Sequence, residues 1–353
     1  MVARKVLLKD IANKVGVSTA LVSYVLNGKE KEARVGKEIA KKIRKVAKDL
    51  NYQPNLIARG LKFGKTKTLG LIVADISNPF FSTLARIIEN EAKKNGYTVI
   101  FGSSDEQLDK SDALISTLLN RQVDGLIITP VEGSEGQIAD VQKRGVPLVL
   151  IDRGFKEFET NTVVINNRDV TYNAVNLLIR NGYTRIGMVA YDANLTHMKN
   201  RVKGYRDALK DHKLKFNPGW LKTVSFENTA SDVGGAIHDL LKEGSQQVNA
   251  LLFATNSISV NALKVLSCLK IKVPEEVGII CFDESDVYDF FYSPVTYIRQ
   301  DLDAIGKNAV QILISNIEDG GKESSNKIIP AEIVVNQSCG GKKAPAEVFK
   351  KKA

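Results

Sequence analysis

Cysteine, histidine and tryptophan are scarce in this sequence of 353 residues, which has three cysteines, three histidines and one tryptophan. No two cysteines form a C-x-x-C pair, and His197, His212 and His238 do not have the spacing of metal ligands. These absences argue against a disulfide framework and against a zinc site. We therefore expect a protein without a metal or another cofactor.

Long apolar runs are also missing. The sequence has no run of 18 apolar residues, so no membrane span is expected. The basic N-terminus is not followed by the apolar core of a signal peptide, which predicts a cytoplasmic protein. The motifs G-x-S-x-G, H-E-x-x-H, the P-loop and G-x-G-x-x-G do not follow any predicted strand, so no enzyme is expected.

The net charge of +10 is unevenly distributed. Residues 1–68 hold 17 basic and five acidic side chains, the last twelve residues carry a net +4, and residues 69–341 carry a net −6. A basic N-terminal segment beside an acidic body predicts a nucleic-acid-binding module on its own domain. The alternative is a lysine-rich surface that only aids solubility. The lysine-rich tail, 342–353, is expected to be disordered.

The first fifty residues predict three short helices. A helix over 9–15 is ended by Gly16, and Ser18 suits the N-cap of a second helix directly after a tight turn. A third helix follows within 36–52, with apolar positions at Ile39, Ile43, Val46, Ala47 and Leu50. Two helices joined by so short a turn are typical of a helix-turn-helix.

The second of these helices has one polar face without any charge. That face consists of Thr19, Ala20, Ser23, Tyr24 and Asn27. The second helix of a helix-turn-helix enters the major groove, where hydroxyl and methyl groups can meet base edges. Ser23 suits a phosphate contact, as do nearby lysines such as Lys9. Ser18, at the start of the helix, is also a predicted DNA-binding residue. The alternative is a three-helix bundle that binds a protein.

At these residues the sequence resembles the LacI/GalR family of bacterial repressors. The resemblance is carried by "DIANKVGVSTALVSYVLNG" and "LNYQPNLIARGL", and it continues over residues 7–337. It implies that the second segment is a hinge helix that folds in the minor groove when two subunits dock. Leu61 would then be the wedge that opens a base step, and Arg59 would contact the minor groove or backbone. The hinge residues assigned to DNA in this way are Asn55, Ala58, Arg59 and Leu61.

Two features depart from the family pattern. Tyr24 replaces the arginine that commonly reads a guanine, and the loop over 28–36 is longer than usual. We therefore predict DNA binding to an operator that differs from the family norm at the base pair facing Tyr24.

Apolar strand-like runs alternate with amphipathic helices from residue 69 onwards. The runs are "LGLIVAD", "YTVIFGS", "DGLIITP", "VPLVLID", "RIGMVAY", "ALLFAT" and "GIICFD". The pattern restarts midway, since "KNGYTVIFGSS" resembles "RNGYTRIGMVA". Such alternation predicts parallel sheets covered on both faces. The fold class we expect is an all-α helix-turn-helix domain plus an α/β periplasmic-binding-protein-like core of two doubly wound parallel-sheet subdomains.

These patterns divide the chain into four parts. We expect a DNA-binding domain over 1–53, a hinge helix and linker over 54–67, a core of two interleaved subdomains over 68–341, and a basic tail over 342–353. The core would bind an effector and form a dimer.

Ligands of doubly wound sheets lie beyond the carboxyl ends of the strands, here in the cleft between the two halves. Carboxylates, amides and an arginine around an aromatic wall would suit a polyhydroxylated ligand. The candidate residues are Asp75, Asn78, Phe80, Asp152, Arg153, Arg201, Phe226, Asn256, Asp283 and Gln300.

The family resemblance implies effector contacts for Asp152, Arg201 and Asp283, and it implies an aromatic stacking role for Phe226. The alternative for the charged residues is structural, either as helix caps or as a salt bridge between the halves. We expect His197 only to pack near the cleft edge.

We therefore expect a homodimeric repressor that binds a near-palindromic operator in double-stranded DNA in the bacterial cytoplasm, at the nucleoid. A small-molecule effector, a sugar rather than a purine, would control it as an inducer or as a corepressor. Two other classes remain open: an exported sugar-binding protein and an enzyme on a doubly wound scaffold.

Overall fold

The computed structural model describes residues 6–52, 65–155, 159–244, 247–320 and 324–340. The chain forms two compact units, Met1–Thr66 and Lys67–Ala353, which we describe separately. The tail predicted over 342–353 lies outside the described residues. So do the hinge residues assigned to DNA from the sequence, which are Asn55, Ala58, Arg59 and Leu61.

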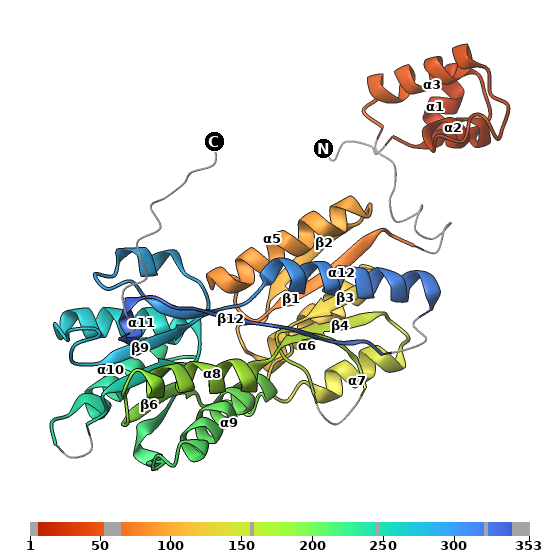
Figure 1. Cartoon of the computed structure of the whole chain (residues 1–353). Helices are drawn as coiled ribbons and strands as arrows, with labels where there is room; N and C mark the ends of the chain where they lie inside the picture. The colour runs from red at the N-terminus through yellow and green to blue at the C-terminus, as the bar shows by residue number, and fades with distance from the viewer. Residues whose placement is uncertain (1–5, 53–64, 156–158, 245–246, 321–323, 341–353) are drawn as a thin grey trace. The chain divides into compact units, whose positions relative to one another are not determined.

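The N-terminal unit is a helix-turn-helix followed by a third helix (Figure 1), as the sequence predicts. Its described helices are α1 (Leu8–Val15), α2 (Thr19–Leu26) and α3 (Lys37–Asp49). Gly16 ends α1 in the left-handed conformation with φ 82°, which glycine adopts without steric cost. The Ser18 hydroxyl caps α2 by accepting a hydrogen bond from the backbone nitrogen of Leu21 at 3.2 Å.

One small apolar core holds the three helices together. It is built from Ile11, Ala12, Val22, Val25, Ala40, Ile43 and Ala47. Ile39, one of the apolar positions of the third helix, lies outside this core and is 44% exposed. The small side chains of Ala40 and Ala47 let α3 approach closely, so the inward face is centred on Ala40, Ile43 and Ala47 and leaves Ile39 outside.

The C-terminal unit contains two six-stranded sheets, which confirms the predicted pair of doubly wound subdomains. Sheet A has the order β11-β5-β4-β3-β1-β2, and all of its strands are parallel. Its strands are β1 (Thr68–Val73), β2 (Thr98–Ser103), β3 (Gly125–Ile128), β4 (Leu148–Ile151), β5 (Asn161–Ile165) and β11 (Asn326–Ile329).

Sheet B has the order β12-β10-β9-β8-β6-β7 and repeats the layout of sheet A. Its strands are β6 (Ile186–Tyr191), β7 (Leu221–Val224), β8 (Ala250–Phe253), β9 (Gly278–Phe282), β10 (Thr296–Arg299) and β12 (Glu332–Val334). Here β12 pairs antiparallel with β10, so the expectation of purely parallel sheets fails at this edge. The reason is that the chain reaches β12 directly from β11, without a helix to reverse its direction.

Helices cover both faces of each sheet (Figure 1). Sheet A carries α5 (Pro79–Lys94), α6 (Leu108–Asn120), α7 (Glu135–Lys143) and α12 (Leu302–Asp319), and together they form lobe A. Sheet B carries α8 (Asn167–Arg180), α9 (Thr196–Asp211), α10 (Thr229–Leu241) and α11 (Asn256–Cys268), and together they form lobe B.

The chain crosses between the lobes three times. It passes from β5 to α8, from β10 to α12 and from β11 to β12. The side chain of Asn166, in the first crossing, accepts a hydrogen bond from the backbone nitrogen of Ala331, in the third, at 2.8 Å. Each lobe is thus built from segments that are distant in the sequence, and the crossings are where the lobes can move relative to each other.

The similar segments "KNGYTVIFGSS" and "RNGYTRIGMVA" both contain the end of a helix, but they lead into strands that are not equivalent in the two sheets. The first segment leads into β2, an edge strand of sheet A, whereas the second leads into β6, which occupies the place of β1 in sheet B. Both segments end a helix with a glycine at positive φ, Gly96 at 74° and Gly182 at 93°. They share a helix stop and do not mark equivalent strands of the two halves.

Candidate ligand pocket and nucleic-acid interface

The uncharged face of α2 is open to solvent. Thr19, Ala20 and Asn27 are exposed, Tyr24 is 45% exposed, and Ser23 is half-buried. Lys9 and Ser18 are exposed beside this face. The opposite side of α2 buries Val22 and Val25 in the core.

Asn27 also has a local structural role. Its amide nitrogen donates to the Ser23 carbonyl at 2.7 Å, which closes the last turn of α2. The lysines of α3 are exposed: Lys37, Lys41, Lys42, Lys45 and Lys48. A neutral exposed helix face and exposed cations in the same small unit suit base edges and phosphates, respectively.

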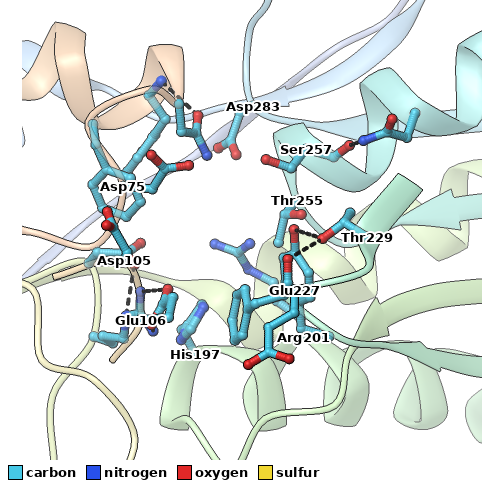
Figure 2. Close-up of a pocket in the computed structure, with 18 of the residues that line it drawn as sticks. Asp75, Asp105, Glu106, His197, Arg201, Glu227, Thr229, Thr255, Ser257 and Asp283 are labelled. Atoms are coloured by element: carbon cyan, nitrogen blue, oxygen red, sulfur yellow. Dashed lines mark hydrogen bonds and ion pairs between the residues drawn. The ribbon is translucent and has the colours of Figure 1, made fainter. Parts of the chain in front are cut away.

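A pocket of about 480 Å³ lies in the C-terminal unit and is lined from both lobes (Figure 2). Lobe A contributes Asp75, Asn78, Phe80, Phe81, Asp105, Glu106, Asp152 and Arg153. Lobe B contributes Tyr191, His197, Arg201, Phe226, Glu227, Thr229, Ala230, Thr255, Ser257, Asn261 and Asp283. Gln300, in the second crossing, completes the lining. The wall thus includes every sequence-predicted ligand residue except Asn256.

Asn256 lies beneath the pocket wall and is 3% exposed. Its backbone nitrogen donates to Asp283 Oδ2 at 3.2 Å, at the start of α11. Its neighbours Thr255 and Ser257 line the pocket instead. The side-chain nitrogen Nδ2 of Asn256 is buried and has no hydrogen-bond partner in the described structure.

Asp283 is held by groups from two directions. Its Oδ1 accepts a hydrogen bond from Gln300 Nε2 at 2.6 Å, while its Oδ2 faces the start of α11. Burial raises the pKa of Asp283, and Arg201 and the Gln300 hydrogen bond offset part of that rise. Helix capping, the structural alternative for this residue, therefore applies to Oδ2, which accepts a hydrogen bond at the start of α11.

Arg201 points into the pocket from the middle of α9 (Figure 2). Its Nε donates to Asn167 Oδ1 at 2.8 Å and its Nη1 donates to the Ala254 carbonyl at 2.6 Å. Its guanidinium lies 3.6 Å from the centre of the Phe282 ring. These contacts fix the side chain in one orientation without a carboxylate partner.

Arg153 is paired inside lobe A. Its two terminal nitrogens donate to the two carboxylate oxygens of Glu106 at 3.0 and 2.6 Å, and its Nε lies 3.4 Å from Asp152 Oδ2. Burial by itself lowers the pKa of Arg153, but Glu106 and Asp152 together raise it. Sequence reasoning missed Glu106, although it closely follows the end of β2, where the rule on strand ends would have found it.

Two predicted residues of lobe A also shape the loop before α5. Asn78 Oδ1 accepts from the backbone nitrogen of Phe80 at 3.0 Å and caps α5. Asp75 Oδ1 accepts from the backbone nitrogen of Ser77 at 2.8 Å. Phe80 and Phe81 meet edge to face with ring centres 4.9 Å apart. These contacts order the aromatic wall of lobe A.

Phe226 forms the aromatic wall of lobe B. One face of its ring stacks on Tyr191, with ring centres 4.0 Å apart and an angle of 26° between the planes. The Tyr191 hydroxyl lies 3.2 Å from the Thr229 hydroxyl. A ring supported in this way can offer its other face to a ligand.

His197 lines the pocket, whereas the sequence suggested only packing. It is 7% exposed, and its Nδ1 has no hydrogen-bond partner. Burial, together with the charges of Arg153 and Arg201, lowers its pKa well below the usual value. The imidazole is therefore neutral at physiological pH.

Across the described ranges, no group of three or more His, Cys, Asp or Glu side chains is arranged to hold a metal ion. Among the helices that the structure describes, none combines the length and apolar character that a membrane crossing requires.

A helix-turn-helix unit joined to a two-lobed periplasmic-binding-protein-like core defines a class of bacterial transcriptional regulators. Residues 7–55 match the family model described as bacterial regulatory proteins, lacI family. Residues 66–337 match the model described as periplasmic binding proteins and sugar binding domain of LacI family. The chain belongs to the lacI family.

Named relatives agree with this assignment. The chain is 31% identical over 333 residues to the HTH-type transcriptional repressor PurR of Aliivibrio salmonicida, covering 94% of this chain and 98% of the relative. It is 29% identical over 332 residues to the ribose operon repressor of Haemophilus influenzae, with the same coverage. The chain is thus similar to transcriptional repressors.

The fold is also that of a solved repressor. The structure superposes on the lac repressor dimer bound to operator and the anti-inducer ONPF with a TM-score of 0.83. The identity is 21%, and the alignment covers 95% of this chain and 99% of that chain.

Proposed function

We propose that this regulator is a repressor whose affinity for a specific operator is controlled by a sugar bound in the pocket between lobes A and B. The observation that carries the proposal is that Asp152 and Asp283, one from each lobe, line a single cavity. A ligand that bonds to both would couple binding to the separation of the lobes.

The hydrogen-bonding character of the wall favours a sugar over a purine. Ionised carboxylates only accept hydrogen bonds, and a further buried acceptor, Gln300 Oε1, has no partner. A sugar supplies many hydroxyl donors, and its apolar ring face suits the free face of Phe226. A purine base brings fewer donors and adds ring nitrogens that need donors themselves. The name of the ribose operon repressor among the relatives supports the same choice.

Hydrogen bonds connect the pocket to the crossings between the lobes. Arg201 bonds Asn167, directly after the first crossing, and Asp283 bonds Gln300 in the second. A ligand that displaces Arg201 or Asp283 would therefore shift the lobes, and the hinge predicted over 54–67 would carry that shift to the DNA-binding domain over 1–53. Effector and operator must then change each other's affinity by the same factor, whether the effector is an inducer or a corepressor.

The repressor acts as a homodimer in this proposal. Phe101, on the edge strand β2, is 60% exposed, and Phe290 and Tyr292 are 87% and 61% exposed. Exposed aromatic side chains of this size are typical of protein interfaces. A dimer with twofold symmetry presents two copies of the α2 face, so the operator is a near-palindrome. The repressor would bind this operator in the bacterial cytoplasm.

Two measurements test this function. An operator is first selected from random DNA with the full chain, and its affinity is then measured by gel shift with and without sugars. The active sugar should also raise thermal stability, by about 2.7 kcal/mol at 100 times its dissociation constant. Operator affinity that no ligand changes would overturn the regulated switch. Recovery of the protein from the periplasm would instead favour an exported sugar-binding protein.

A further inference from the structure

The charge of the pocket wall is strongly one-sided. Among the residues that the structure describes, six carboxylates line it but only two guanidinium groups, those of Arg153 and Arg201. The carboxylates belong to Asp75, Asp105, Glu106, Asp152, Glu227 and Asp283. Asp105 is paired with Lys110, which does not line the pocket. Arg153 and Arg201 are therefore the cations among the lining residues that the structure describes. Whether an anionic ligand can bind therefore depends on whether either arginine is available.

Arg153 is closed to an anion by its own partner. Its side chain is 3% exposed, and both of its terminal nitrogens are engaged by Glu106, which is 13% exposed. Asp152 occupies the remaining side of the guanidinium at 3.4 Å from Nε. A phosphate would have to displace Glu106 from a two-point ion pair and then lie beside Asp152.

Arg201 is also restricted. Its Nε and Nη1 are occupied by Asn167 and the Ala254 carbonyl, and one face lies on Phe282. The negative charge of Asp283 already acts on it. His197 adds no charge, because its imidazole is neutral. An anion in this pocket would thus meet one partly engaged cation among several carboxylates.

We propose that the pocket selects an uncharged ligand and that Glu106 is the specificity-determining residue, because it withholds Arg153 from anions. The inference rests on the proposed function: for a sugar effector, it assigns the free sugar and excludes the sugar phosphate. The regulator would then respond to the compound that a sugar kinase consumes and not to the product of that kinase.

Matched pairs of ligands test this selection on the full-length wild-type protein. Ribose is compared with ribose 5-phosphate and glucose with glucose 6-phosphate, by thermal shift and by titration calorimetry. In any pair that binds, the free sugar should bind at least tenfold more tightly than its phosphate. A phosphate that binds as tightly as its free sugar, or more tightly, would overturn the charge selection and leave sugar control intact.

A second pair separates this inference from the proposed function. Hypoxanthine is compared with inosine 5′-monophosphate under the same conditions. Binding of the base alone, with no response to any sugar, would overturn the sugar effector but support selection against charge. Tight binding of the nucleotide would contradict both.

The variant Glu106→Gln tests the assigned residue. Freed from its carboxylate partner, Arg153 should bind a phosphate, so the affinity for the phosphorylated ligand should rise at least tenfold relative to the free ligand. Glu227→Gln is the matched control, because it removes the same charge from the wall without releasing an arginine. An equal gain in phosphate affinity in the two variants would show that the overall negative charge of the wall repels phosphates. Glu106 would then not be the specificity-determining residue.

A double variant controls for destabilisation of the protein by an unpaired buried arginine. Glu106→Gln combined with Arg153→Gln leaves no buried arginine without a partner, and the phosphate gain should disappear. A gain that persists in the double variant would contradict the role assigned to Arg153. The wild-type ligand pairs decide the charge selection even where a variant does not fold.

Discussion

Asp152 and Asp283 occupy equivalent positions in the two lobes. Asp152 follows β4 and Asp283 follows β9, the strands that hold the same place in sheets A and B. Each has a left-handed backbone with φ 67°, and each is 7% exposed. Aspartate adopts this conformation more readily than most residues, and its occurrence at both positions shows that the two strands end in the same way. The two lobes thus present the same carboxylate to one pocket.

The first prediction concerns this pair. Asp283→Asn should weaken effector binding by about ten- to a hundredfold, because a hydrogen bond to a charged group contributes about 1.5–3 kcal/mol. Asp152→Asn should act in the same direction. Calorimetric titration measures both, and Asp109→Asn, an exposed aspartate of α6, serves as the control. Unchanged affinity in both variants would remove the aspartates from the binding site.

The second prediction concerns pH and His197. Below its usual pKa of about 6.5, the unfolded histidine takes up a proton, whereas buried His197 stays neutral because its pKa is lowered. The native state therefore loses stability as pH falls below 6.5, by up to about 1.4 kcal/mol per pH unit until the lowered pKa is reached. Urea unfolding at several pH values measures this loss.

In His197→Gln the unfolding free energy should depend less on pH over this range. The control is His212→Gln, which replaces an exposed histidine and should keep the wild-type dependence. An identical pH dependence in His197→Gln and the wild-type protein would show that His197 takes up a proton in the native state.

The third prediction concerns the contact between α8 and α9. A Cβ atom at Gly204 would lie 2.2 Å from the carbonyl oxygen of Arg168 and 3.0 Å from the Tyr172 nitrogen. Gly204→Ala should therefore push the two helices apart and lower stability by about 1–3 kcal/mol. Since Arg201 and Asn167 join the same helices, effector affinity should fall as well.

Thermal unfolding and calorimetric titration measure the two effects of Gly204→Ala. Gly235→Ala is the control, because nothing lies within 4 Å of a Cβ atom at that position of α10. It should leave stability unchanged or raise it slightly. Wild-type stability in Gly204→Ala would contradict the close packing.

The fourth prediction concerns the base that faces Tyr24. The wild-type operator should lack the guanine that an arginine would read there, and Tyr24→Arg should introduce a preference for it of about 1–3 kcal/mol. Selection from random DNA measures the preference. Ile39→Arg adds the same charge at a similarly exposed position of α3 and should leave the base preference unchanged. A guanine selected equally by the wild-type and Tyr24→Ala proteins would make Tyr24 a bystander.

The fifth prediction concerns the dimer. Phe290→Glu places a charge on the most exposed of the large apolar side chains in the described part of the chain and should weaken dimerisation by about 2 kcal/mol or more. Sedimentation velocity measures the shift towards monomer. Ile328→Glu, on the opposite edge of sheet A from β2, should remain dimeric. A dimer unaffected by Phe290→Glu would place the interface elsewhere.

Much of the fold could be predicted from the sequence because its signals are local. Seven strands were visible as apolar runs, whereas β5, β7, β10, β11 and β12 were missed. Strands such as "LKTV" and "NKII" mix polar and apolar residues on half-covered edges, so their pattern is weak. The long helix α12 was also missed, although it covers sheet A after the second crossing.

The candidate site was predictable to the extent that it follows one rule. Residues at the carboxyl ends of parallel strands gather at one edge of a sheet, and this rule by itself predicts that Asp75, Asp152 and Asp283 lie near the pocket. The rule could not say which side chains turn inward. Asn256 is buried at the start of α11 and does not line the cavity, whereas His197 and Glu106 do.

The sequence by itself determined the helix-turn-helix, since helix caps and apolar spacing act over a few residues. Ser18, Gly16 and the faces of α2 follow from neighbours in the chain. Only the tertiary structure decided that Arg153 pairs with Glu106, which lies 47 residues away after a strand that is not its neighbour in the sheet. The pairing depends on the register of four parallel strands, and it sets the charge that a ligand can carry into the pocket.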